Sequence, residues 1–349
     1  MTMTSPRPPT AVPPTVLPLT VAGLRAAPGT KTRGTVQAQL GAGEGYFDTP
    51  PTMDIPLTLV AGARPGPRVV ITAGVHGGEF TGIDAAARLA AALEPESVCG
   101  QVVVCPVANP PAVYRGRLGV SPLDGVNINR VFPGDGDGTP TERLAAWLFT
   151  HLLDGADAYL DLHSGGIDET LTDFVGLRLT GDLAVDTTAA GIAVSLGIPD
   201  LVLGLSAEGG NSHAAAARCG IPSVLVESGQ LGSRDADAAR RLVEGLRGAL
   251  RSLGVLPADA SATVPAPVVR QWVWAGAVAA DETGLWYPEF AAGDDLTEGQ
   301  IIGRIVDPAD GREHKVEAPV SGRVFYGMHG LTVAAGAELA AIAVPRDLD

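Results

Sequence analysis

Cysteine, positive charge and long apolar runs are all scarce in this sequence. The 349 residues include three cysteines that form no CxxC pair, so neither a disulfide scaffold nor a cysteine zinc site is indicated. Lys and Arg number 24 against 39 Asp and Glu, a net charge of −15 that excludes a broad basic surface for nucleic acid or anionic membranes. Because no run of about 18 apolar residues occurs, no membrane span is predicted.

Two catalytic signatures are also missing. The chain contains no GxSxG turn and no GxxxxGK[ST] loop, which argues against a serine hydrolase and a P-loop enzyme. Its N-terminal residues lack the apolar core of a secretory signal. Together with the unpaired cysteines, this predicts a cytoplasmic protein without a nucleic-acid or membrane partner. A homo-oligomer is compatible with the sequence.

Hydrophobic residues make up 46% of the chain, which is enough for a sizeable core. Residues 1–20 are predicted as a flexible Pro-rich tail and 21–254 as a catalytic domain. Residues 255–267 have the Pro/Ala composition of a linker, and 268–349 are predicted as a small β-barrel-like domain. Beyond the linker helical spacing disappears, and short strand patterns alternate with Gly/Asp turns.

Strand and helix patterns alternate within residues 21–254. Several of the strand patterns are apolar throughout, which is typical of a parallel or mixed sheet that is covered on both faces. The predicted fold class is therefore α/β, a mixed sheet sandwiched by helices, with a C-terminal all-β domain. The predicted strands are 68–75, 101–106, 158–162, 174–179 and 223–226, and the predicted helices are 81–93, 141–153, 214–218 and 236–253.

A histidine and a glutamate flank two glycines where the first of these strands ends. The segment His76-Gly77-Gly78-Glu79 precedes a predicted helix, and ligands of α/β sheets bind at the carboxyl ends of strands. The glycines let the backbone turn tightly, so that an imidazole and a carboxylate can converge. These residue types supply two of the three protein ligands of a catalytic zinc site. The alternative is a loop histidine and a glutamate that only stabilises the helix N-terminus.

The predicted strand over 158–162 ends in the same way, in the segment DLHSGG. Its His163 would complete a His/Glu/His set of metal ligands. Asp161 lies two residues earlier on the same face of the strand, so its carboxylate can hold the second nitrogen of a metal-bound imidazole. The alternative is a buried aspartate bonded to backbone amides and a histidine that only covers the sheet end.

Two further segments offer polar side chains. A loop rich in turn residues contains Arg115, Arg117, Asn129 and Arg130. Arginines gathered in one loop of an acidic protein indicate an anion site, unless they are merely exposed. The strand before the last predicted helix ends in Glu227. A carboxylate close to a metal site can act as a general base, whereas a strand-end glutamate can also simply face solvent.

In this order the motifs resemble the succinylglutamate desuccinylase/aspartoacylase family, a branch of the zinc carboxypeptidase-like fold. The resemblance covers roughly residues 59–232 and rests on HGGE, NPPAVYRGR, SPLDGVNINRVFPG, DLHSGG and VLVESG. The C-terminal run also resembles the small β-domain of that family, which is similar to biotinyl and lipoyl barrels. Because its turn EAPVSGRV holds no lysine to carry such a cofactor, we expect a structural role or one in shaping the mouth of the site.

The resemblance implies a role for each matching residue of the metal site. His76, Glu79 and His163 would bind one Zn²⁺ per chain. Glu227 would be the general base and then the general acid, and Asp161 would orient a zinc-bound histidine.

The resemblance also implies how the substrate is held. Asn129 and Arg130, with Arg115 beside them, would bind its carboxylate. Arg117 would polarise the scissile carbonyl, although the spacing also allows Arg115 in that role.

The implied reaction is zinc-dependent hydrolysis of the amide bond of a small N-acyl amino acid. The acyl group is left open, and deacetylation of a diaminobutyrate-type compound is one of several options. The alternative enzyme is a metallocarboxypeptidase acting on a peptide or an amino-acid conjugate. A metal-free binding protein with the same fold is a third class, which the complete set of ligand candidates disfavours.

Overall fold

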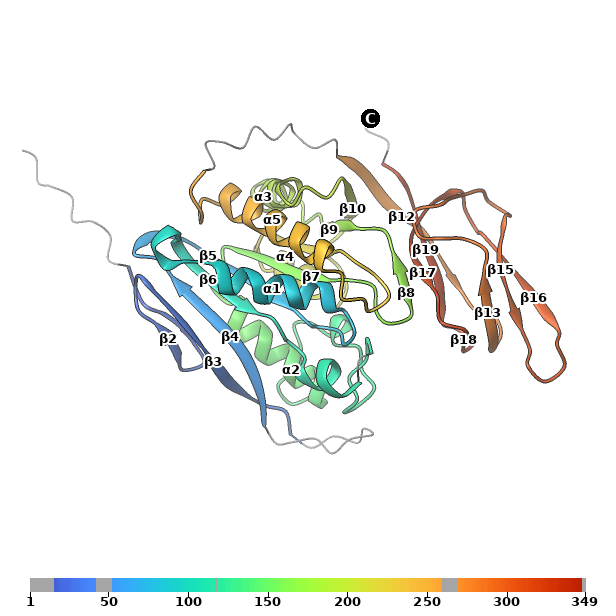
Figure 1. Cartoon of the computed structure of the whole chain (residues 1–349), viewed down its shortest axis with the longest axis horizontal. Coiled ribbons are helices and arrows are strands. Elements are labelled where there is room, and N and C mark those ends of the chain that lie inside the picture. The colour runs from blue at the N-terminus through green and yellow to red at the C-terminus, as the bar shows by residue number, and fades with distance from the viewer. Residues whose placement is uncertain (1–15, 42–51, 117, 259–268, 347–349) are drawn as a thin grey trace, which may run out of the picture.

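The computed structural model describes residues 16–41, 52–116, 118–258 and 269–346. In this part of the chain, a mixed sheet of 13 strands runs through the centre (Figure 1), in the order β14-β17-β19-β12-β10-β9-β11-β7-β5-β6-β4-β3 with β8 paired to β17. The strands before the sequence-predicted linker are β3 (Thr30–Gln39), β4 (Thr52–Ala61), β5 (Arg64–Ala73), β6 (Cys99–Cys105), β7 (Ala158–His163), β8 (Glu169–Leu171), β9 (Phe174–Arg178), β10 (Asp200–Gly204) and β11 (Ser223–Glu227). The later ones are β12 (Arg270–Ala279), β14 (Asp295–Leu296), β17 (Gly322–Met328) and β19 (Glu338–Pro345).

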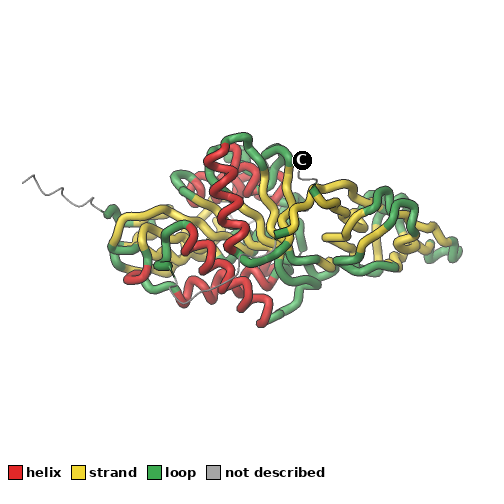
Figure 2. Tube along the Cα trace, turned by 90° about the horizontal axis from the view of Figure 1, so that it is seen from above, coloured by secondary structure: helices red, strands yellow, loops and turns green. Residues whose placement is uncertain are grey.

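Helices cover both faces of the central strands, as Figure 2 shows from above. On one face, Leu89, Ile192 and Leu246 of three helices share a core with Ile71 and other strand residues. On the other face, Leu144 and Ala216 of two helices pack with Tyr159 and its neighbours. The first three helices are α1 (Phe80–Ala92), α3 (Leu183–Ser195) and α5 (Ala236–Ser252), and the other two are α2 (Pro140–Leu148) and α4 (Ser212–Arg218).

Local sequence explains where these helices begin. In α2, Thr139 and Glu142 form a reciprocal capping box around Pro140. In α5, Asp235 accepts hydrogen bonds from the backbone N–H groups of Asp237 and Ala238. In each case a polar residue satisfies N–H groups that the first helical turn would leave unpaired.

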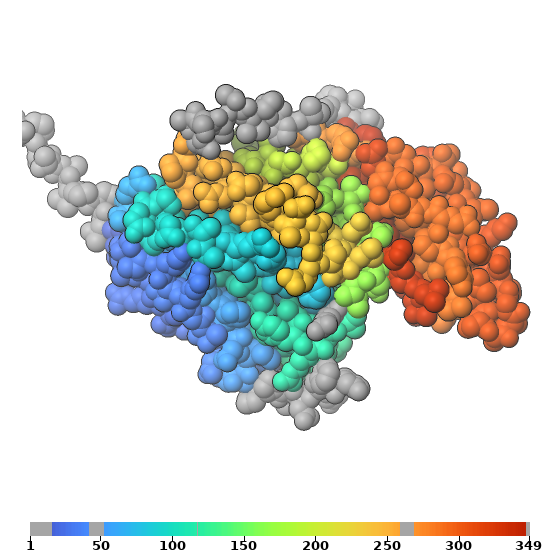
Figure 3. Space-filling model, in the orientation of Figure 1, coloured from blue at the N-terminus to red at the C-terminus, as the bar shows by residue number. Residues whose placement is uncertain are grey.

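Residues 269–346 form an antiparallel part that lies beside the helical part as a separate lobe (Figure 3). Its second sheet has the order β16-β15-β13-β18. A core that includes the buried Trp286, Ile302 and Ile342 lies between this sheet and the end of the large one. The strands of the second sheet are β13 (Gly284–Pro288), β15 (Ile301–Val306), β16 (Glu313–Glu317) and β18 (Thr332–Val333).

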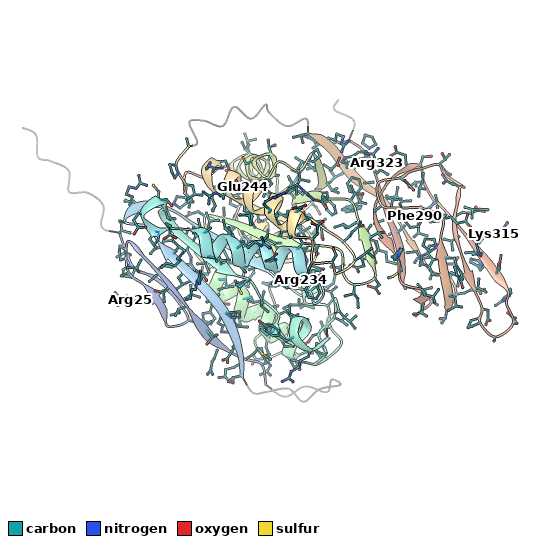
Figure 4. The ribbon with its side chains drawn as sticks, viewed as in Figure 1. Arg25, Arg234, Glu244, Phe290, Lys315 and Arg323 are labelled. Carbon is teal, nitrogen blue, oxygen red and sulfur yellow. The ribbon has the colours of Figure 1, made fainter. Side chains whose placement is uncertain are left out.

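The two parts are joined through β12, which pairs in parallel with β10. Asp200 of β10 is buried and accepts hydrogen bonds from Arg270 at 2.7 and 2.6 Å and from the indole N–H of Trp272 at 2.7 Å. The guanidinium of Arg323, labelled in Figure 4, lies 5.2 Å from the Trp272 ring. These contacts fix the antiparallel strands against the sheet that carries the candidate site.

The fold prediction is confirmed at the level of a mixed α/β sheet with helices on both faces and a C-terminal antiparallel domain. Each predicted strand and helix has a counterpart, although α2 ends at Leu148 and continues as the π-helical turn η4 (Phe149–Leu153). The sequence analysis did not identify α3 or β10. In α3 the apolar residues surround the helix instead of forming one stripe, so periodicity gave no signal.

The domain boundaries stay predictions. Residues 1–15 of the expected tail and 259–267 of the expected linker lie outside the described residues. Val255 and Leu256, at the start of that linker, are buried in the core of the helical part. None of the helices in the described ranges is long and apolar enough to cross a membrane.

Candidate metal site and cavity

Three parallel neighbours in the sheet, β5, β7 and β11, end at the same edge and carry predicted residues. His76 follows β5, His163 is the last residue of β7, and Glu227 ends β11 directly opposite His163. Between His76 and Glu79 the chain turns at Gly78, whose φ of 89° favours glycine. The sheet therefore gathers side chains that are remote in sequence at its carboxyl edge.

His76, Glu79 and His163 form a group that could hold a metal ion. Their ligand atoms all lie within 4.8 Å of one another. The Nδ1 atoms of His76 and His163 lie 2.7 and 2.8 Å from the two oxygens of Glu79. Glu79 occupies the N-cap position of α1, yet its side chain makes no hydrogen bond to the helix. Its carboxylate therefore serves the imidazoles and not the helix N-terminus.

Hydrogen bonds on the far side of each ring fix which nitrogen faces Glu79. Nε2 of His76 lies 2.9 Å from Oδ1 of Asn127, and this oxygen also accepts the backbone N–H of Asn129, so Nε2 must donate. Nε2 of His163 lies 3.0 Å from a carboxylate oxygen of Asp161 and donates likewise. Both Nδ1 atoms are then available to a cation, which is the usual arrangement around metal-bound histidines.

Asp161 is completely buried and fully bonded. Besides the His163 ring, it accepts hydrogen bonds from Thr72 Oγ1 at 2.6 Å and from Ser212 Oγ. Burial alone would raise the pKa of Asp161, but the charge of His163 and these hydrogen bonds lower it to about 2. Asp161 is therefore ionised and holds one orientation of the imidazole.

Without a cation, the three groups need additional protons. Each Nδ1 can bond Glu79 only if it carries a hydrogen, while Nε2 of the same ring already donates. Burial alone would lower the pKa of His163, but Asp161 and Glu79 raise it well above its usual value. A divalent cation would replace these protons and bind both imidazoles and the carboxylate at once. Two imidazoles and one carboxylate are a known donor set of catalytic zinc, so the residues fit such an ion.

Glu227 lies beside this group with a free oxygen. Its Oε2 is buried and has no hydrogen-bond partner among the described residues. Burial raises the pKa of Glu227 well above its usual range, against the opposing charge of His163, and the nearby carboxylates of Glu79 and Glu169 act in the same direction as burial. The side chain lines a cavity and does not face bulk solvent. Such a carboxyl group can exchange a proton with a molecule in that cavity.

The cavity has a volume of about 550 Å³ and lies between the two parts of the protein. Its walls include the metal-site residues and also Trp274 of β12, Tyr326 of β17 and Glu338 of β19. Acidic side chains that line it include Asp168 and Glu169. The antiparallel part therefore shapes the site, which was one of the two roles expected for it.

Two arginines line the cavity. Arg130 donates from Nη1 to the carbonyl of Asn129 at 3.0 Å, and Arg178 donates from Nη2 to Oδ1 of Asn211 at 3.5 Å. The buried Asn129 side chain accepts the backbone N–H of Ser212 at 2.8 Å. Asn129 therefore connects the loop to α4, in addition to lining the cavity.

Neither predicted arginine of the preceding loop is found among the described residues that line the cavity. Arg115 is exposed at the end of the π-helical turn η2 (Pro111–Gly116), and the cavity-lining residues do not include it. Arg117 lies outside the described residues.

Sequence reasoning missed four functional candidates or undervalued them. Asn127 and Ser212 act through contacts 51 residues apart in the chain, so no local pattern marks them. Arg178 had a signal, because it is a charged residue at the end of an apolar strand pattern. His213, which has no metal-ligand partner near it in the sequence, also lines the cavity.

Replacing Asp161 with Asn should weaken metal binding by about 10- to 100-fold. In the unmodified protein Thr72, His163 and Ser212 all donate to the Asp161 carboxylate. The NH₂ group of asparagine would face one of these donors, and His163 would lose the acceptor that fixes its tautomer. Competition with a chromogenic chelator measures the affinity. Thr72→Val is the matched control, because it removes one bond to Asp161 and leaves the carboxylate, and its loss should be smaller. Equal affinities of Asp161→Asn and the unmodified protein would contradict the orienting role.

Comparison with known proteins supports one family. Residues 65–253 match the succinylglutamate desuccinylase/aspartoacylase catalytic domain. The N-alpha-acetyl-L-2,4-diaminobutyric acid deacetylase of Halomonas elongata is 33% identical over 256 residues, which cover 72% of this chain and 74% of the relative.

Solved structures agree with this assignment. A succinylglutamate desuccinylase/aspartoacylase from Rhodobacter sphaeroides superposes with a TM-score of 0.79 at 28% identity, covering 91% of this chain and 96% of the other. The product-bound ectoine utilization protein EutE (DoeB) of Ruegeria pomeroyi gives a TM-score of 0.79 at 25% identity over 94% of this chain and 98% of the other. The predicted resemblance is thus confirmed, and the protein belongs to the succinylglutamate desuccinylase/aspartoacylase family.

Proposed function

We propose that the protein is a zinc-dependent amidohydrolase that removes the acyl group from a small N-acyl amino acid. The observation that carries the proposal is the convergence of His76, Glu79 and His163 beside the unpaired carboxyl oxygen of Glu227. Its relative in Halomonas elongata is a deacetylase, so the chemistry of deacylation occurs in this family. The sheet arrangement is in keeping with the zinc carboxypeptidase-like fold, which we include in the proposal.

The proposed mechanism divides the work between the metal and the protein. When bound, Zn²⁺ would polarise the scissile carbonyl and lower the pKa of an attacking water to about 7. His76, Glu79 and His163 would hold the ion, and Asn127 and Asp161 keep the two rings oriented. The positive charge of the ion would favour the ionised form of Glu227, whose Oε2 atom would take the proton of the attacking water and pass it to the leaving amine.

Charges of both signs in the cavity favour a substrate that also carries both. N-alpha-acetyl-L-2,4-diaminobutyric acid, the compound named for the Halomonas relative, has a free carboxylate and a free amino group. Arg130 and Arg178 offer positive charge, and Glu169 and Glu338 offer negative charge. We therefore propose this compound, or a close analogue, as the substrate.

The roles proposed for the arginines and for Asn129 come from the resemblance to the family. Arg117 is still our candidate for polarising the carbonyl, with Arg115 as its alternative. Asn129 and Arg130 are still candidates for holding the substrate. The metallocarboxypeptidase alternative is less favoured, because strands β12, β17 and β19 line the cavity and leave about 550 Å³, which suits a small conjugate better than a peptide. We also propose a cytoplasmic location, in keeping with the three free cysteines.

A hydrolysis panel tests the proposal. Purified protein loaded with Zn²⁺ should release acetate from N-alpha-acetyl-L-2,4-diaminobutyrate faster than it cleaves N-acetylaspartate or N-succinylglutamate. Removing the metal with a chelator should abolish the release, and added Zn²⁺ should restore it. The ion bound by His76, Glu79 and His163 is what would activate the attacking water and polarise the carbonyl. If the metal-loaded protein cleaves no member of the panel, or if the chelator has no effect, the proposal is wrong.

A further inference from the structure

The cavity contains an arginine that no carboxylate of the described chain neutralises. Arg178 ends β9, and its side chain lies across β10, where a Cβ atom at Gly204 would come within 2.3 Å of Arg178 Cδ. Glycine at this position is therefore required for the arginine to lie on the cavity floor. The guanidinium donates to the Asn211 side chain at 3.5 Å. Burial lowers the pKa of Arg178, and the charge of Arg130 lowers it further; among the described residues no carboxylate opposes this shift. A half-buried cation that has no carboxylate partner in the described chain favours the binding of an anion that enters the cavity.

A second polar group in the cavity also lacks a partner. His213, in the first turn of α4, is 4% exposed and lines the cavity. Its Nδ1 is buried without a hydrogen-bond partner among the residues that the structure describes. Burial and the charge of Arg178 lower the pKa of His213 to about 3. The ring is therefore neutral and keeps one N–H group to donate.

We propose that Arg178 and His213 together bind the free carboxylate of the N-acyl amino acid and so determine the specificity of the site. The carboxylate would neutralise the guanidinium through one oxygen and accept the imidazole N–H through either oxygen. Asn211 holds the arginine in place, since it donates to the Asn129 carbonyl at 3.1 Å while it accepts from Arg178. This assignment rests on the proposed function. It adds Arg178 and His213 to the residues proposed to hold the substrate, Asn129 and Arg130, and Arg130 is exposed.

A cationic group is not the occupant, because it would meet the charge of Arg178. The scissile carbonyl is also a poor candidate, because it must lie at the group of His76, Glu79 and His163 beside Glu227. The free carboxylate, which is joined through Cα to the amide nitrogen, is the remaining charged part of the substrate, and it matches the charge of Arg178 in the same cavity.

The test compares two substrates that differ only at the carboxylate, N-alpha-acetyl-L-2,4-diaminobutyrate and its α-carboxamide. The unmodified protein should prefer the carboxylate by roughly 10- to 150-fold in kcat/KM, as expected for a hydrogen bond to a charged group. In Arg178→Met and His213→Phe, the carboxylate substrate should lose most of this factor through KM, while the carboxamide should change little. His213→Asn restores a neutral donor and should retain more of the preference than His213→Phe. Arg240→Met, at an exposed position of α5, is the matched control and should behave like the unmodified protein.

Two outcomes would overturn the inference. One is an equal loss with both substrates in Arg178→Met and His213→Phe, since that indicates an effect on the reacting bond or on the fold. The other concerns binding, measured by calorimetry with L-2,4-diaminobutyrate and its carboxamide. The unmodified protein should bind the carboxylate more tightly than the carboxamide, and Arg178→Met should bind both equally. An unmodified protein without this preference, or an Arg178→Met variant that keeps it, would overturn the inference. This measurement needs no turnover, so it tests the carboxylate site even if the protein cleaves neither substrate and the proposed function fails.

Discussion

Glu79→Gln should yield a folded protein that contains almost no metal and has lost more than about 100-fold of its hydrolytic activity. Glutamine has the size of glutamate but lacks the negative charge that a zinc site requires. In the metal-free protein its amide oxygen can accept from one imidazole and its NH₂ group can donate to the other, so the contacts to His76 and His163 are kept. The substitution therefore removes the metal ligand without leaving an unpaired group in the site.

Metal content and thermal unfolding together check this expectation. Adding Zn²⁺ at 100 times its Kd should stabilise the unmodified protein by about 2.7 kcal/mol and should not stabilise Glu79→Gln. Glu244→Gln, an exposed carboxylate on α5 (Figure 4), is the matched control and should bind metal normally. Because protons compete for His163, whose pKa is raised, metal affinity of the unmodified protein should fall as the pH is lowered. Near-stoichiometric zinc in Glu79→Gln would remove Glu79 from the ligand set.

The candidate metal ligands were predictable because each motif is local. His76 and Glu79 are three residues apart around a glycine turn, and Asp161 and His163 share a strand face. Each motif follows an apolar strand pattern, and the carboxyl ends of parallel strands meet at one edge. The sequence did not show which strands are neighbours in the sheet. In the structure β5, β7 and β11 lie side by side, and this brings the two motifs together.

The rest of the site depends on contacts that the sequence does not signal. Asn127 reaches His76 from a loop, and Ser212 reaches Asp161 from the first residue of α4, so both contacts depend on how these segments pack on the sheet. Trp274 lies on β12 and Glu338 on β19. They line the cavity because β12 pairs in parallel with β10 of the helical part and antiparallel with β19. Strand pairing over such a distance is a property of the whole fold, so the substrate side of the cavity could not be described from motifs alone.

Glu227→Gln should retain its metal and lose roughly 10²- to 10⁴-fold in kcat. Glutamine fits the position, since the Oε2 atom of Glu227 has no hydrogen-bond partner in the described part of the chain that the change could break. It cannot take up a proton from water at neutral pH, so the step assigned to Glu227 fails while the ligand group of His76, Glu79 and His163 is untouched. Single-turnover kinetics and metal analysis of the same preparation separate the two effects. Near-normal turnover with bound metal would exclude Glu227 as the general base.

Stability gives an independent check on the same variant. The pKa of Glu227 is raised in the folded protein, so the unfolded chain ionises this group more readily. The folded state is therefore penalised as the pH rises from about 4.5 toward the folded-state pKa, and at neutral pH the metal-free protein carries that penalty. Glutamine removes it, so metal-free Glu227→Gln should unfold at the same temperature as the unmodified protein or at a higher one. A variant that is inactive and also less stable would have lost its activity through the fold, whereas an inactive variant of equal or greater stability has lost a proton acceptor.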